Sequence, residues 1–118
     1  VRDRIAGQVE YIRHWKVYNK SHRSAPEVQI TWFIDPPYSN PAGRVYTFSS
    51  IDYQHLGMWC LSRKGQVIVC EIEGASWLPF KPFVEQKSCS GRGRASSRME
   101  VIWTNNTHRC VPHSLLFD

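Results

Sequence analysis

Apolar residues recur at helical spacing near the start of the chain, at Ile5, Val9, Ile12, Trp15 and, less regularly, Tyr18. Positions three or four residues apart share one face of a helix, so this recurrence is typical of an amphipathic helix. Arginine and lysine side chains fall on the other face. The pattern predicts a helix over Ile5–Tyr18 that covers one face of a sheet.

Two apolar runs, Val28–Ile34 and Gln66–Glu71, have the length and composition of buried strands. Between them, Ser49 or Ser50 can cap a helix that continues to about Ser62. The order strand, helix, strand indicates a parallel pair joined by a right-handed crossover.

A second pair of strands is predicted after the loop Glu73–Phe80. Phe83–Lys87 and Met99–Trp103 are apolar enough to pair, and the small-residue, basic stretch Ser88–Arg98 separates them. This order indicates an antiparallel hairpin with its tip in solvent. The expected fold is therefore α/β and a single domain over residues 1–118, with about four strands, a parallel pair plus an antiparallel hairpin, and two main helices.

Composition and charge narrow the class of protein. A net charge of +5 and a pI near 9.2 favour a polyanionic partner. No run approaches the roughly 18 apolar residues of a membrane span, so no membrane association is expected. Four cysteines without a CxxC pair suggest a reduced, intracellular protein. A zinc site is the alternative, but its candidate ligands lack the usual spacing; they are Cys89, His108, Cys110 and His113.

The stretch Thr31–Tyr38 carries the most specific chemistry. Its apolar strand runs into Asp35, Pro36, Pro37 and Tyr38, and prolines end a strand because they cannot donate to the ladder. The carboxyl end of a strand is where open α/β sheets bind ligands. A carboxylate and a proline carbonyl there can accept both hydrogens of an exocyclic amine, and a tyrosine ring can stack on a planar base. The alternative is a strand that simply ends in a Pro-Pro turn with a surface tyrosine.

With this motif in its context, the sequence resembles the amino-methyltransferases that modify the exocyclic amine of adenine in DNA. Among them it is most similar to the site-specific enzymes of bacteria and phages. The similarity covers most of residues 9–106 and is carried by Thr31–Tyr38, Gly43, Tyr46, Asp52-Tyr53, Gly65–Glu71, Gly74–Phe80 and Glu100–Asn105.

The resemblance implies a partial Rossmann-like methyltransferase sheet and assigns roles to residues. Asp35, Pro36, Pro37 and Tyr38 would form the catalytic motif, with Asp35 also facing the cofactor, S-adenosylmethionine. Tyr38 would stack on a base flipped out of the duplex. Candidates for lining the base pocket are Tyr38, Trp77, Phe80 and Trp103, although core packing is the alternative for the last three and the favoured one for Trp103. Candidates for contacting DNA phosphates are Lys87, Arg92, Arg94 and Arg98, with a solvated loop as the alternative. The expected location is the cytoplasm of a bacterial or phage-infected cell.

The family's cofactor-binding elements are missing from the sequence. It has neither the glycine-rich turn after a first strand nor the acid that ends a second, so the strand Val28–Ile34 would lack a neighbour on one side. The chain, which begins with Val1, is then a fragment or a processed product, is completed by a second polypeptide or a copy of itself, or is a non-catalytic nucleic-acid-binding or assembly module. Cytosine is an alternative target, since the same corner could hold its amine.

Overall fold

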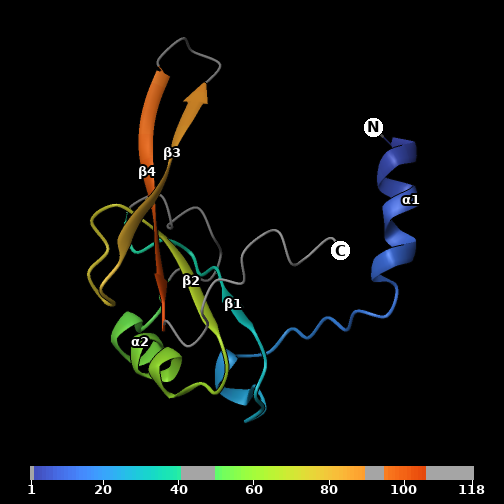
Figure 1. Cartoon of the computed structure of the whole chain (residues 1–118), viewed down its shortest axis with the longest axis horizontal. Coiled ribbons are helices and arrows are strands. Elements are labelled where there is room, and N and C mark those ends of the chain that lie inside the picture. The colour runs from blue at the N-terminus through green and yellow to red at the C-terminus, as the bar shows by residue number, and fades with distance from the viewer. Residues whose placement is uncertain (1, 41–49, 90–94, 106–118) are drawn as a thin grey trace, which may run out of the picture.

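The computed structural model describes residues 2–40, 50–89 and 95–105, which form an α/β structure with two helices and a four-stranded mixed sheet (Figure 1). In chain order the elements are helix α1 (Arg2–Ile12), a 3₁₀ turn (His22–Ser24), strand β1 (Trp32–Ile34), helix α2 (Tyr53–Ser62), and strands β2 (Val67–Ile72), β3 (Lys81–Cys89) and β4 (Ala95–Thr104).

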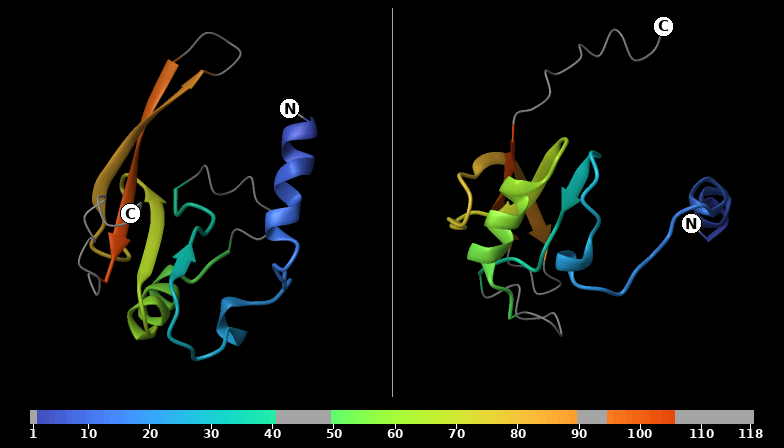
Figure 2. Two further views of the ribbon diagram at one scale, coloured as in Figure 1. Left: turned by 45° about the vertical axis from the view of Figure 1, so that its right-hand side comes forward. Right: turned by 90° about the horizontal axis from the view of Figure 1, so that it is seen from below.

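The strands lie in the order β1-β2-β4-β3. Strand β1 pairs with β2 in parallel, with Phe33 opposite Ile68, and β4 pairs antiparallel with both β2 and β3. The expected parallel pair and antiparallel hairpin are therefore confirmed. Strand β4, the last in sequence, lies in the interior of the sheet, and β1 and β3 form the two edges of the sheet (Figure 2).

Helix α2 covers one face of the sheet, and the core lies between them (Figure 1). Asp52 caps the helix, because its side chain accepts a hydrogen bond from the His55 amide. The side chains of strand β2 point alternately to the two faces of the sheet, so that every second one faces α2. Trp103 also packs there and is only 8% exposed, as the core interpretation predicts. The buried cluster comprises Leu56, Cys60, Val67, Val69, Leu78 and Trp103.

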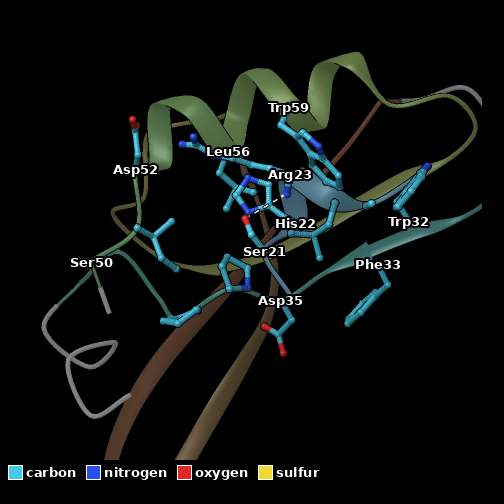
Figure 3. Close-up of a pocket in the computed structure, with 15 residues that line it drawn as sticks. Ser21, His22, Arg23, Trp32, Phe33, Asp35, Ser50, Asp52, Leu56 and Trp59 are labelled. Carbon is cyan, nitrogen blue, oxygen red and sulfur yellow. Dashed lines mark hydrogen bonds between the residues drawn. The ribbon is translucent and has the colours of Figure 1, made fainter. Parts of the chain in front are cut away.

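The opposite face of the sheet is more open. Strand alternation and register place Phe33, Cys70 and Glu100 on this face, and Phe33 is 67% exposed. Asp35 lies two residues after Phe33, so it falls on the same face, and it is also exposed. Figure 3 shows Phe33 and Asp35 on the side of β1 that faces away from α2.

The prediction that the first helix covers a face of the sheet is wrong. Helix α1 ends at Ile12, buries none of its residues and stands apart from the sheet (Figures 1 and 2). Trp15 and Tyr18, which the periodicity assigned to the helix, follow it in a non-helical segment and are 66% and 67% exposed. Periodicity defines an apolar side of a helix, but it does not supply a surface for that side to pack on.

The strand Val28–Ile34 was also expected to be longer and fully buried. Only Trp32–Ile34 pair with β2, and Val28 and Ile30 are 40% and 47% exposed. The reason is its position, because a strand with one neighbour in a sheet covered on one face cannot be enclosed. Among the described residues, no helix is long and apolar enough to cross a membrane.

Candidate functional site

The segment Asp35–Tyr38 leaves the carboxyl end of β1 and lies at two cavities. One, of about 350 Å³, is lined by Asp35, Pro36, Pro37 and Tyr38. The other, of about 590 Å³, is shared by the first three of these residues with β1, α2 and the 3₁₀ turn (Figure 3). Both volumes lie within the range of small-molecule sites. We call the segment Asp35–Tyr38 the corner.

The corner is anchored to helix α2. The Tyr53 hydroxyl donates a hydrogen bond to the Pro37 carbonyl oxygen at 2.5 Å. Burial, followed by the charge of Glu71, raises the pKa of Tyr53, so its hydroxyl keeps the proton that it donates. Because this bond occupies the Pro37 carbonyl, it fixes the backbone that presents the carbonyl of Pro36.

A fully buried carboxylate holds the chain just beyond the corner. Glu71, on β2, is 0% exposed and accepts from the Ser39 amide at 2.7 Å and from the Ile72 amide at 2.7 Å. The Trp77 indole donates to the same carboxylate at 3.2 Å. A buried charge is tolerated only where such donors satisfy it. Glu71 therefore ties the loop after Tyr38 to the centre of the sheet.

Tyr38 is oriented by a residue from β4. Its hydroxyl lies 3.4 Å from the Glu100 carboxylate, to which it donates. Burial raises the pKa of Tyr38 to about 12, with further contributions from the charges of Glu100 and Asp35 and from Cys70. The phenol is therefore neutral at physiological pH, and its ring is held at one end while the residue remains half-buried.

The open face of the corner presents hydrogen-bond acceptors. Asp35, Cys70 and Glu100 share this face of the sheet, and burial, followed by the charges of Asp35 and Glu100, raises the pKa of the Cys70 thiol. Within the described residues, neither carboxylate belongs to an ion pair. Carboxylates are acceptors only, so this arrangement suits a ligand that brings N–H donors.

Of the four aromatic residues proposed for the base pocket, Tyr38 lies at the corner and the other three do not. Trp77 packs edge-on against Phe80, with ring centroids 5.0 Å apart, and against Tyr53 at 5.6 Å. Trp77 and Phe80 are half-buried against the core cluster, and Trp103 lines a separate cavity of about 260 Å³. Neither cavity at the corner is lined by any of the three. Their contact with a base stays a prediction.

Of the basic residues predicted to contact DNA, Arg98 lies exposed on β4 and Lys87 belongs to β3. Arg92 and Arg94 lie outside the described residues, as do three of the proposed zinc ligands, His108, Cys110 and His113. Within the described part of the chain, no three potential ligands gather to hold a metal.

His22, which lines the larger cavity, forms with His55 a histidine pair that sequence reasoning missed. The rings of His22 and His55 lie 5.7 Å apart, and His22 packs edge-on against Trp59 at 5.2 Å. His22 Nε2 and His55 Nδ1 are buried and find no hydrogen-bond partner among the described residues. Burial, followed by the charges of His55 and Arg23, lowers the pKa of His22. No motif joins two histidines this far apart in the sequence, so only the fold could reveal them.

Comparison of the chain with protein-family models, with curated proteins and with solved structures gave no match. The interpretation of the corner therefore depends on its residues and their geometry.

Proposed function

We propose that the chain is the base-holding half of a DNA adenine methyltransferase with a partial Rossmann-like sheet. In this proposal Asp35 and the Pro36 carbonyl accept the hydrogens of the exocyclic amine, and the Tyr38 ring stacks on the base. One observation carries the proposal: Asp35, Pro36 and Pro37 line two adjoining cavities, so a group held by the corner is accessible from two sides.

The electrostatics of the corner support this assignment. Asp35 and Glu100 offer negative charge where an amine would donate, and Tyr38 keeps its proton, so its ring carries no charge. A neutral ring face suits stacking, which contributes about 1–3 kcal/mol per base. The hydrogen bonds of Tyr53 and Glu71 fix the corner before a ligand arrives, and this lowers the cost of positioning the amine.

S-adenosylmethionine supplies the methyl group in enzymes of this kind, but the described residues do not make a complete site for it. Among the described residues, no glycine lines the larger cavity, and the carboxylates that line it are Asp35 and Asp52, of which Asp52 already caps α2. The glycine-rich turn of the family is absent from the sequence. In the proposal, this chain holds the base, and a second chain that pairs with β1 holds the methyl donor.

A DNA partner agrees with the charge of the chain. The net charge of +5 favours phosphate binding, and the exposed Arg98 lies on the long hairpin β3–β4. Lys87, Arg92 and Arg94 are the other proposed phosphate contacts. The proposed location remains the cytoplasm of a bacterial or phage-infected cell.

The alternative is a non-catalytic nucleic-acid-binding or assembly module derived from a methylase. The incomplete cofactor cavity and the unpaired edge of β1 favour it. Calorimetry with S-adenosylmethionine in the presence of a completing chain separates the two, because the proposal predicts binding and the alternative predicts none.

Transfer of a labelled methyl group from S-adenosylmethionine to DNA, measured with the chain and its completing chain together, tests the catalytic proposal. We expect transfer to adenine that is lost in Asp35→Ala and retained in Glu73→Ala, which removes an exposed acid that lines neither cavity. Transfer that Asp35→Ala leaves unchanged would show that the assigned chemistry is wrong. No transfer in the presence of the completing chain, together with adenine-specific binding, would favour the non-catalytic module.

A further inference from the structure

The two edges of the sheet differ in their protection against pairing with another strand. The β3 edge begins with Lys81 and Pro82, has an irregularity in its register between Pro82 and Val84, and carries the exposed Glu85. Lysine, proline and bulges are the usual devices that prevent association of sheet edges. The stretch at the β1 edge, residues 28–35, contains no lysine, arginine, proline or glycine.

The unprotected edge presents free backbone groups. The Trp32 amide donates to the Gln66 carbonyl at 2.8 Å, so Trp32 is turned toward β2. Because bonding directions alternate along a strand, the N–H and C=O of Phe33 point away from β2. Within the described part of the chain, no backbone partner meets them.

Apolar side chains accompany these groups. Phe33 is 67% exposed, and Val28 and Ile30, which precede β1, are 40% and 47% exposed. Helix α1 stands apart from the edge (Figure 2). A strand edge with free amides and exposed apolar side chains is a template for another strand.

We propose that the partner is a second copy of this chain, which pairs through the same edge. Two identical strands related by a two-fold axis run antiparallel, and the interface closes because each copy uses the same surface. The two four-stranded sheets then join into one sheet of eight strands.

The pairing of aromatic side chains and the repulsion between like charges select the register of the two β1 strands. A two-fold axis at Phe33 pairs this residue with its copy, exchanging both backbone hydrogen bonds and stacking two aromatic side chains. It also places Asp35 opposite Thr31. An axis at Thr31 would instead place Asp35 opposite Glu27, and like charges directly opposite are destabilising. Pro36 ends the pairing, so each copy contributes residues 31–35.

The predicted dimer is reversible. Five residues from each strand bury far less than the roughly 1,600 Å² of a typical stable interface. Association in the micromolar range is therefore expected, and the dimer should be populated only as the protein is concentrated.

Sedimentation velocity of the full chain, over an about hundredfold range of concentration, tests the proposal. We expect the mass to rise from 13.7 kDa toward twice that value. Phe33→Lys should weaken association at least about tenfold by placing two ammonium groups opposite each other. Phe33→Pro should act similarly, because it removes the outward N–H and no bond to β2. Phe83→Lys, at a 64% exposed position on the other edge, is the matched control and should associate like the parent.

Two results overturn the proposal. One is a parent chain that stays monomeric at the highest concentration. The other is association that persists in Phe33→Lys or is lost in Phe83→Lys, since either places the interface elsewhere. Circular dichroism verifies that each variant is folded. If Phe33→Pro does not fold, the association of Phe33→Lys alone tests whether the β1 edge is the interface. The measurement uses no nucleic acid, so its failure and the failure of the proposed base-holding function are distinguishable.

Discussion

At the scale of single residues, Glu71 connects the corner to the core. It accepts hydrogen bonds from Ser39, Ile72 and Trp77 while fully buried, so the alignment of the corner depends on its negative charge. Tyr53 donates a further hydrogen bond to the Pro37 carbonyl, and Glu100 accepts one from Tyr38. The residues of the corner are consecutive in sequence, whereas the residues that hold them come from α2, β2 and β4.

Replacing Glu71 with glutamine tests this connection. Glu71→Gln keeps the size of the side chain but turns one acceptor into a donor that faces other donors. We expect the free energy of unfolding to fall by about 2 kcal/mol, measured by urea denaturation. Glu73→Gln, at an exposed neighbouring position, should change it by less than about 0.5 kcal/mol. Equal effects of the two variants would contradict the role of Glu71.

The ionisation of Tyr38 provides a second test. Its pKa of about 12 in the folded chain exceeds the ordinary value of 10.0, so folding favours the protonated phenol. The resulting stabilisation is fully present below pH 10 and is lost as the pH rises through 12. At pH 10 the phenolate absorbance of the folded parent should equal that of folded Tyr38→Phe. In denaturant at pH 10 the phenolate absorbance of the parent should exceed that of the variant, because about half of the Tyr38 side chains are then ionised. If the folded parent shows more phenolate absorbance at pH 10 than folded Tyr38→Phe, Glu100 and burial do not raise the pKa of Tyr38.

At the scale of elements, local patterns predicted the strands and turns, and long-range packing set the rest. The parallel pair and the hairpin were predicted because apolar runs and basic or glycine-containing breaks are local signals. The position of α1 could not be predicted, since Ile5, Val9 and Ile12 define an apolar side but no partner. The roles of Glu71 and Glu100 were missed for a similar reason. Their contacts arise from strand pairing and loop closure across 32 and 62 residues.

Gly65, in the turn between α2 and β2, illustrates a contact of this kind. Its φ is +90°, and a Cβ there would meet the Ile30 carbonyl oxygen at 2.1 Å. Gly74 has a similar φ of +93° but open space around it. Both alanine variants should incur the left-handed backbone cost of about 1 kcal/mol, and Gly65→Ala should lose at least about 2 kcal/mol more. Urea denaturation measures the difference, and similar losses would contradict the close approach of the two segments.

Helix α1 should contribute little to stability. It has 11 residues, none of them buried, and isolated helices of this length are marginal in water. Deleting the chain through Ile12 should change the free energy of unfolding by less than about 0.5 kcal/mol. Hydrogen exchange of the intact chain should also show unprotected amides in α1 beside protected ones in β2. A large loss on deletion would mean that α1 packs on the sheet in solution.

At the scale of the whole molecule, one sheet edge has two potential uses. The proposed function requires a chain that holds the methyl donor to pair with β1, and the proposed dimer uses the same Phe33 backbone groups. The two pairings exclude each other, so a completing chain should dissociate the dimer. A net charge of +5 favours binding to any polyanion in either state. Salt-dependent DNA binding alone would therefore not distinguish a methylase half from another basic module.

The central claim is that the corner recognises the exocyclic amine of adenine. It is tested most directly by the affinity for two single-stranded oligonucleotides that differ only in one adenine, replaced in the second by purine without the amine. Single strands avoid the cost of flipping a base from a duplex. Hydrogen bonds to charged groups contribute about 1.5–3 kcal/mol, so the adenine strand should bind at least about tenfold more tightly. Asp35→Ala should abolish this preference, and Glu73→Ala should keep it. Equal affinity of the parent chain for the two strands, or a preference that survives in Asp35→Ala, would contradict the account.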